Sequence, residues 1–222
     1  PILAHGTAAQ KKEILPKIAK GEAVCTIAAL EEDGDWNAES INVRADKRGD
    51  NYIINGMKLF VPDAKIANYI LVAARTKRTE NREDGITVFI LDTQDLWGMV
   101  STRSKTMDET RKVYEVVFMN VPVPSKNILG ELHQGWPIMK EIALQTSAAL
   151  CAEMVGASEK AFEMTLAYLK DRIAFGVPIG TFQALQHRAA DLVIGLEFAR
   201  SLMEWAAETI KENDPDALVA VS

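Results

Sequence analysis

The sequence changes its hydrophobic period at Val121-Pro122-Val123-Pro124, and this change constrains the fold more than any other feature. Before it, from about Ala23, short apolar runs of strand type follow one another with no helical period between them. After it, residues 137–171 form a long stretch rich in Ala, Met and Leu, with apolar positions every three to four residues. This order predicts an α+β chain: an antiparallel β-barrel or sandwich domain, then long antiparallel helices.

Turn signals divide the β-region into strands. Arg48-Gly49-Asp50 predicts one turn, and Asn55-Gly56 predicts a hairpin, because both positions of such a turn tolerate positive φ. The basic run Arg75-Thr76-Lys77-Arg78 is expected to be a solvated loop. The apolar runs predict strands at residues 51–54, 69–74, 86–91 and 113–118.

Helices are expected on both sides of the β-region. Thr7 is placed to cap a short amphipathic helix over residues 7–20, with Gly21 in a left-handed C-cap. Thr181 is expected to cap the last long helix, which Asn213-Asp214-Pro215 ends. Two long helices leave apolar surface uncovered, so the helical bundle is expected to be incomplete in this sequence. The expected divisions are residues 1–22, the end of an N-terminal helical region; 23–130, the β-domain; and 131–222, the first helices of a C-terminal domain.

Composition excludes several classes of function. The 222 residues carry a formal charge of −6, which argues against nucleic acid as the main partner. No apolar run approaches the roughly 20 residues of a membrane span. His5, His133 and His187 lack metal-ligand spacing, so no metal site is expected. Cys25 and Cys151 are far apart and predict two small buried hydrophobic residues in a reduced intracellular compartment. The expected localisation is cytoplasmic, or the mitochondrial matrix if the protein is eukaryotic.

Taken alone, the segment from Arg172 to Ile179 has an ordinary interpretation. A cation meets the negative end of a helix dipole, Gly176 caps the helix, and Pro178 prevents its continuation. The Phe182-Gln183 pair that opens the next helix is equally unspecific by itself.

The order of the motifs is far more specific than any one of them. Along the chain they are Gly6-Thr7, Leu15-Pro16-Lys17, Ala29-Leu30-Glu31-Glu32-Asp33-Gly34, Asn55-Gly56-Met57-Lys58, Val121-Pro122-Val123-Pro124, Asn127-Ile128-Leu129-Gly130, Gly135-Trp136, and Arg172-x-x-Phe175-Gly176-x-Pro178-Ile179 with Phe182-Gln183. In this order they resemble the acyl-CoA dehydrogenase family over essentially the whole chain. Related acyl-CoA oxidases share much of the same framework.

The resemblance implies a fold, a cofactor and a reaction. Family members bind FAD between a central β-domain and helices, and the acyl-CoA thioester stacks against the flavin. A carboxylate removes the α-proton while the β-hydrogen moves as hydride to flavin N5. Electrons usually leave through an electron-transfer flavoprotein, and a homotetramer or heteromeric tetramer is expected.

The resemblance also implies site residues. The guanidinium of Arg172 is expected to reach the FAD of a neighbouring subunit, because its planar fork of donors suits a pyrophosphate. Gln183 stands at a helix start, where free backbone N–H groups favour an anion. Asn37 is expected on the substrate side. The full set of expected cofactor-binding residues is Leu30, Glu32, Gly34, Phe60, Val61, Arg172, Phe175, Phe182 and Gln183.

Several positions depart from the family pattern. Glu31 replaces a flavin-contacting threonine, so that it either lowers the flavin reduction potential by charge repulsion or turns to solvent. Pro62 replaces the threonine of a Trp-Ile-Thr strip and has neither hydroxyl nor N–H to offer flavin N5. Ser147 falls at the substrate-side arginine, and Thr146 at the catalytic glutamate of one branch of the family. No catalytic base is therefore expected in this chain, since the commoner base position lies beyond Ser222.

Two interpretations of Glu153 stay open. As a carboxylate within an apolar helix it could have a perturbed pKa and do chemistry, or it could pair with Arg188 or His187. The function expected from the resemblance is FAD-dependent α,β-dehydrogenation of an acyl-CoA thioester. The alternative is a non-catalytic or half-site subunit of a heteromeric enzyme. Taken alone, these residues are expected to be inactive, to bind FAD weakly and to associate through exposed apolar surface.

Overall fold

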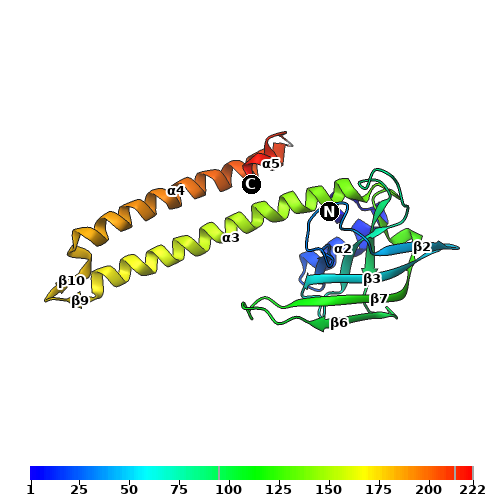
Figure 1. Cartoon of the computed structure of the whole chain (residues 1–222), viewed down its shortest axis with the longest axis horizontal. Helices are drawn as coiled ribbons and strands as arrows, with labels where there is room; N and C mark the ends of the chain where they lie inside the picture. The colour runs from blue at the N-terminus through cyan, green and yellow to red at the C-terminus, as the bar shows by residue number, and fades with distance from the viewer. Residues whose placement is uncertain (95, 213, 222) are drawn as a thin grey trace. The chain divides into compact units, whose positions relative to one another are not determined.

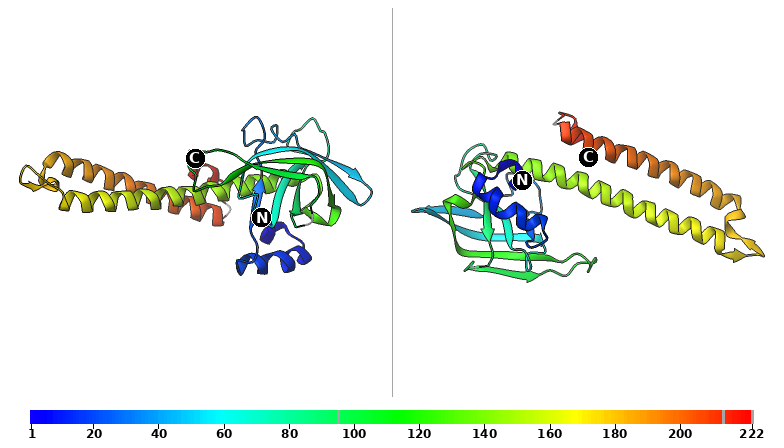
Figure 2. Two further views of the ribbon diagram at one scale, coloured as in Figure 1. Left: turned by 90° about the horizontal axis from the view of Figure 1, so that it is seen from below. Right: turned by 180° about the vertical axis from the view of Figure 1, so that it is seen from behind.

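The computed structural model describes residues 1–94, 96–212 and 214–221. The chain divides into two compact units, Pro1–Lys140 and Glu141–Ser222. The first unit contains a large, mostly antiparallel sheet, and the second consists mainly of long helices (Figures 1 and 2). The predicted α+β class, with a β-region followed by long helices, is confirmed.

The N-terminal helices follow the predicted capping. Helix α1 spans Ile2–His5 and α2 spans Ala8–Ala19. Thr7 and Gln10 form a reciprocal capping box, and Gly21 adopts the predicted positive φ of 72°. The Gln10 amide also donates to the carbonyls of Lys126 and Ile128, which fastens α2 to the β-region.

One eight-stranded sheet forms the β-region, in the order β6-β7-β3-β2-β4-β5-β8, with β1 paired to β4. Neighbouring strands of this sheet pair antiparallel, except that β1 runs parallel to β4 and a single parallel bridge joins β2 to β4. Apolar side chains from most strands make one core, which includes Ile54, Ile70 and Phe89. The strands are β1 (Cys25–Ala28), β2 (Arg44–Arg48), β3 (Asn51–Pro62), β4 (Tyr69–Arg75), β5 (Ile86–Asp92), β6 (Met99–Arg103), β7 (Val113–Pro124) and β8 (Ile128–Leu129), with the 3-10 turn η1 (Ser125–Asn127) between the last two.

The predicted hairpin at Asn55-Gly56 is wrong. Both residues lie inside β3, where the register against β7 shifts between Ile54 and Gly56. The Asn55 side chain accepts a hydrogen bond from the Asn120 N–H at 2.8 Å, and Gly56 has a φ of 138°. A Cβ on Gly56 would lie 2.8 Å from Val43 Cγ2. The glycine therefore permits a β-bulge and a close approach between strands, while the turn itself lies at Gly49-Asp50 as predicted.

The two prolines of the Val-Pro-Val-Pro segment lie within β7. Strand β6 pairs with β7 only from Tyr114 to Phe118, so beyond this point one edge of β7 has no partner in the described sheet. Pro122 and Pro124 pair with β3 on the other side, opposite Ile53 and Asn51. A strand edge without a ladder partner tolerates residues that lack an N–H.

Long helices follow the sheet, as predicted. Helix α3 spans Gly135–Asp171, and a small hairpin of β9 (Ile173–Ala174) and β10 (Val177–Pro178) leads through η2 (Ile179–Thr181) to α4 (Gln183–Glu212) and α5 (Ala217–Ala220). Figures 1 and 2 show α3 and α4 running in opposite directions, and an ion pair of 3.0 Å joins Arg200 to Glu159.

Three details of the helices differ from the predictions or lie outside them. Thr181 does not cap α4: it belongs to η2 and its hydroxyl donates to the Pro178 carbonyl, while Phe182 takes the extended position before the helix. Helix α4 ends at Glu212, and Asn213 lies outside the described residues. Glu153 is exposed, so the prediction of a carboxylate embedded in an apolar environment is wrong in this chain.

Many large apolar side chains of the helical unit are exposed in the described part of the chain. Those on α4 include Leu192, Phe198 and Leu202. Both cysteines are free and only half-buried, so the expectation of two buried hydrophobic residues was too strong. Within the described parts of the chain, no helix is long and apolar enough to cross a membrane.

Candidate functional site

Two segments of the β-domain, far apart in sequence, meet where the resemblance places the flavin. The segment after β1, here called strip 29–34, runs beside the end of β3. The Leu59 N–H donates to the Leu30 carbonyl at 2.9 Å. The Thr26 hydroxyl donates to the Pro62 carbonyl at 2.7 Å. The expected residues Leu30 and Phe60 are therefore brought onto neighbouring segments.

Phe60 presents its ring outward from an irregular point of β3. The register against β7 shifts between Lys58 and Val61, and Phe60 has a φ of 51° with 53% of its surface exposed. A left-handed conformation costs a bulky residue about 1–2 kcal/mol. An exposed aromatic ring held in this conformation suits contact with a flat ligand. Val61, by contrast, is wholly buried, so its side chain belongs to the core and only its backbone is available.

The remaining residues near strip 29–34 present mainly backbone groups and exposed side chains at the candidate site. The Gly34 N–H closes a tight turn onto the Glu31 carbonyl at 3.0 Å, with a φ of 72° and open space around its Cα. Glu32 is exposed. Asn37 accepts a hydrogen bond from the Ser40 N–H at 2.8 Å, which orders the turn that follows. Next to it lies a cavity of only about 10 Å³, lined by Ala29, Leu30, Asp35, Trp36, Asn37, Ile41, Trp136 and Met139.

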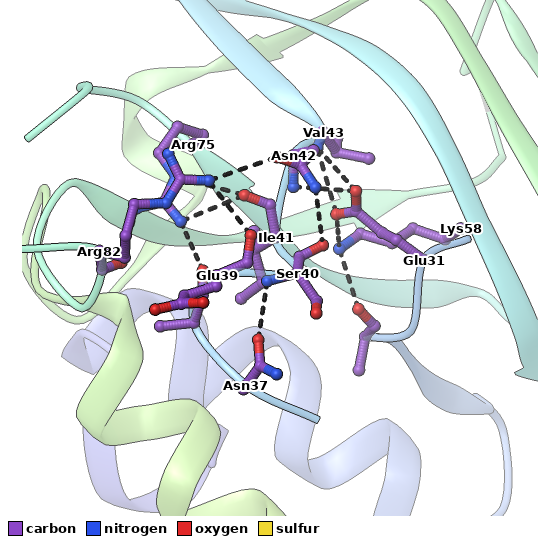
Figure 3. A network of polar contacts seen from close by, with 12 residues as sticks. Glu31, Asn37, Glu39, Ser40, Ile41, Asn42, Val43, Lys58, Arg75 and Arg82 are labelled. Atoms are coloured by element: carbon purple, nitrogen blue, oxygen red, sulfur yellow. Dashed lines mark hydrogen bonds and ion pairs between the residues drawn. The ribbon is translucent and has the colours of Figure 1, made fainter. Parts of the chain in front are cut away.

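Glu31 follows neither of its two predicted interpretations. It is 7% exposed and its carboxylate meets the ammonium of Lys58, which has no exposed surface, at 2.7 Å (Figure 3). It also accepts hydrogen bonds from the backbone N–H groups of Asn42 and Val43. Burial lowers the pKa of the Lys58 ammonium, and the Glu31 carboxylate opposes this shift. Glu31 thus faces the interior of the β-domain, and the exposed carboxylates of the strip are Glu32 and Asp33.

Arg75 corrects a second prediction, because the basic run does not lie entirely in solvent. Lys77 and Arg78 are exposed, but Arg75 is only 6% exposed. Burial and repulsion by Arg82 lower the pKa of its guanidinium. Its side chain donates to the carbonyls of Ala38, Ile41, Arg82 and Asp84. Figure 3 shows Arg75 beside Ile41 and Arg82. It therefore ties the segment after Asn37 to the β4–β5 connection.

The second group of predicted residues lies in loop 172–183, between α3 and α4. The Arg172 carbonyl accepts from the Ile179 N–H at 2.8 Å, which closes the hairpin and leaves the guanidinium exposed. Phe175 and Gly176 both have positive φ, 55° and 83°, as a two-residue hairpin turn requires. Phe175 is 96% exposed, and its ring packs edge-on against Phe182 at 6.2 Å.

Gln183 is the first residue of α4 and is exposed. Loop 172–183 therefore gathers a cation, an exposed aromatic ring and a helix start, a combination that suits a phosphate group attached to an aromatic ligand. Strip 29–34 has the opposite character, because its exposed side chains Glu32 and Asp33 are acidic. The strip with Phe60 offers backbone groups and an aromatic face, and the loop offers a cation and a helix start.

Sequence reasoning missed the buried pair and the buried arginine. A signal for Lys58 existed, since strand alternation from the inward Tyr52 and Ile54 places Lys58 on the same face. No comparable signal marked Arg75 as buried. Among the described residues, no group of three or more His, Cys, Asp or Glu side chains could hold a metal ion.

The comparisons place this architecture, a mostly antiparallel β-domain followed by long helices, in a family of oxidoreductases. The chain belongs to the acyl-CoA dehydrogenase family. The family model "Acyl-CoA dehydrogenase, middle domain" matches residues 26–121, and "Acyl-CoA dehydrogenase, C-terminal domain" matches residues 133–222.

Known proteins resemble the chain along nearly its whole length. It is 33% identical to the mitochondrial short/branched chain specific acyl-CoA dehydrogenase of Bos taurus, over 95% of this chain and 49% of that protein. Butyryl-CoA dehydrogenase from Megasphaera elsdenii superposes with a TM-score of 0.91 at 29% identity, covering 99% of this chain and 58% of that one. A chain in a structure of the electron transferring flavoprotein of Acidaminococcus fermentans gives 0.91 at 31% identity, covering 99% and 58%. The chain thus spans about half the length of the curated relatives it matches.

Proposed function

We propose that this chain, in its native polypeptide, takes part in the FAD-dependent α,β-dehydrogenation of an acyl-CoA thioester. One observation supports this most: Phe60 presents an exposed ring at positive φ beside the Leu30 carbonyl, where the family resemblance places the flavin. When bound, FAD supplies the hydride acceptor. The contribution of this chain is to bind and orient the cofactor and to keep the thioester against it.

In the β-domain, the proposed flavin-side residues are Leu30, Glu32, Gly34, Phe60 and Val61. Phe60 provides the aromatic face. Gly34 allows close approach of backbone, since nothing lies within 4 Å of the place a Cβ would take. Val61 acts through its backbone, because its side chain is buried. The side chain of Glu32 is exposed, and the proposed contact of Glu32 with the flavin is made by its backbone.

In the helical unit, Arg172, Phe175, Phe182 and Gln183 are proposed to reach the FAD of a neighbouring subunit. Arg172 would pair with the pyrophosphate, and Gln183 would add hydrogen bonds at the start of α4. This arrangement requires an oligomer, and we propose a tetramer. An electron-transfer flavoprotein is the proposed acceptor, a proposal supported by the likeness to a chain in the Acidaminococcus fermentans flavoprotein structure.

Few side chains on the proposed substrate side could bind the thioester or accept a proton from it. Asn37 is the proposed substrate contact, although its side-chain oxygen is already engaged by the Ser40 N–H. Ser147 is half-buried on α3 and Thr146 is exposed, and neither provides a carboxylate or a guanidinium. The α-proton acceptor is not assigned to a residue of this chain. The proposed domain limits are residues 1–22, 23–130 and 131–222.

A half-site subunit of a heteromeric acyl-CoA dehydrogenase is the second candidate. Pro62 and Ser147 favour it, because neither offers the group that the family pattern provides, and Thr146 lacks the glutamate that one branch of the family has there. Such a subunit would donate Arg172 and Gln183 to a partner's cofactor and hold little flavin itself. One FAD per chain in a homomeric preparation would count against this candidate.

The test is an anaerobic titration of the protein, in its native polypeptide, with short-chain, branched and long-chain acyl-CoAs while the visible flavin spectrum is recorded. Bleaching by one class of thioester would support the proposed function and identify its substrate. A bound flavin that no acyl-CoA bleaches would refute dehydrogenation by this protein and favour the half-site subunit.

A further inference from the structure

The buried Glu31–Lys58 pair joins three backbone segments that are distant in the sequence. Lys58 Nζ donates to Glu31 Oε1 at 2.7 Å and to the Ala29 carbonyl at 3.0 Å. The Glu31 carboxylate accepts from the N–H of Asn42 at 2.9 Å and of Val43 at 3.1 Å (Figure 3). One charge pair therefore links strip 29–34, strand β3 and the segment that enters β2.

Lys58 also lies directly before the irregularity that turns Phe60 outward. The next residue, Leu59, donates its N–H to the Leu30 carbonyl at 2.9 Å. The register of β3 against β7 changes between Lys58 and Val61. Any slippage of strip 29–34 along β3 would therefore stretch the Leu59–Leu30 hydrogen bond and the ion pair at the same time.

A buried ion pair is a costly way to stabilise a fold. Desolvation of both charges offsets much of their attraction, and apolar residues of similar volume are often as stabilising. Here the charges are also satisfied by backbone groups, the Ala29 carbonyl on one side and the amides of Asn42 and Val43 on the other. The pair is thus built to fix the relative position of backbone segments, and the segments it fixes are those that carry Leu30 and Phe60.

We propose that Lys58 is a positioning residue for FAD: through Glu31 and Ala29 it sets the register between strip 29–34 and the Leu59–Phe60 irregularity. It thereby sets the shape of the surface on which the flavin ring lies. Lys58 has no exposed surface, so its role would be exerted through the backbone segments it joins. This inference rests on the proposed function, which assigns FAD to that surface.

The variants must separate positioning from folding. Lys58→Met alone leaves the Glu31 carboxylate buried without its cation, so it can fail to fold. The double variant Lys58→Met/Glu31→Gln removes both charges and keeps an amide oxygen that can accept from Asn42 and Val43. Lys160→Met is the matched control, because it breaks an exposed ion pair of 2.9 Å with Glu163.

The first readout is FAD titration, followed by flavin fluorescence and visible circular dichroism. The double variant is expected to bind FAD about tenfold more weakly and to give an altered visible dichroism, while Lys160→Met matches the unsubstituted protein. A folded double variant with unchanged affinity and unchanged dichroism would show that the pair serves stability alone, which overturns the proposal.

The second readout needs no FAD. Hydrogen exchange at the Leu59 amide is expected to quicken in the double variant, while amides of the β4–β5 ladder keep their protection. Unchanged exchange at Leu59 would overturn the positioning role whether or not FAD binds. Absence of FAD binding by the unsubstituted protein would instead refute the proposed function and the claim that Lys58 positions the flavin surface. Hydrogen exchange at Leu59 would then still decide whether Lys58 sets the register between strip 29–34 and β3.

Discussion

Replacing Arg75 by methionine should destabilise the β-domain severely, although sequence inspection places this residue in a solvated basic run. The guanidinium is 6% exposed and donates to four carbonyl groups in two segments, 38–41 and 82–84. Hydrogen bonds to a charged group contribute about 1.5–3 kcal/mol each, so the gross loss is about 6–12 kcal/mol.

The net loss should be smaller than this gross figure. Burying a guanidinium carries a desolvation cost that the methionine variant no longer has, and water can hydrate part of the released carbonyls. A buried carbonyl left without a donor costs about 1–3 kcal/mol. With part of the four carbonyls hydrated, we expect Arg75→Met to lower the free energy of unfolding by about 3–5 kcal/mol. Arg78→Met is the matched control, since Arg78 is exposed, and should change it by less than about 0.5 kcal/mol.

Urea unfolding followed by tryptophan fluorescence measures this difference. Because the chain contains two compact units, a Trp205→Phe background is used for all variants, so that the signal comes from Trp36, Trp97 and Trp136 of the first unit. If Arg75→Met were no more destabilising than Arg78→Met, the reasoning that the guanidinium holds the two segments together would be refuted.

Three further predictions concern a bulge, a histidine and the exposed loop. Gly56→Ala should lower the free energy of unfolding by about 1–3 kcal/mol, because the new Cβ would lie 2.8 Å from Val43 Cγ2. Gly156→Ala is the control, since nothing lies within 4 Å of its new Cβ, and urea unfolding compares the two variants. Burial, with a lesser contribution from a nearby lysine, lowers the pKa of His133 below its usual 6.5. The unfolded chain then binds the proton more readily, so stability should fall as pH drops from 6.5 through the folded-state pKa, and His133→Asn should flatten this slope in thermal unfolding from pH 7 to 4. Arg172→Gln should weaken FAD binding about tenfold or more in a titration, with an unchanged melting temperature because its side chain is exposed.

Elements with strong local signals were predictable from the sequence. The N-cap at Thr7 and the apolar runs of β4 and β5 depend on neighbouring residues alone, and the structure confirms them. The Asn55-Gly56 prediction was wrong because the same dipeptide that forms a turn also permits a bulge. Here the Asn120 N–H and the close approach of Val43, both distant in sequence, select the bulge.

In the candidate site, too, features set by neighbouring residues were predictable, and those that depend on distant residues were not. The exposed loop with Arg172 and Phe175 could be located because its residues are contiguous. The expected helix cap at Gly176 was wrong, since α3 ends at Asp171 and Gly176 lies in a hairpin turn. The burial of Glu31 could not be predicted, since it depends on Lys58 and on two amides of a segment eleven or more residues away. Strand alternation could place Lys58 on the inward face, but it could not identify the carboxylate that meets it.

The central claim, that this chain contributes surfaces for FAD, is tested most directly by titrating FAD into the purified protein in its native polypeptide and recording its visible dichroism. The account predicts saturable binding with an induced visible signal, weakened both by Phe60→Ala and by Arg172→Gln. Absence of binding, or binding that neither substitution weakens, would contradict it.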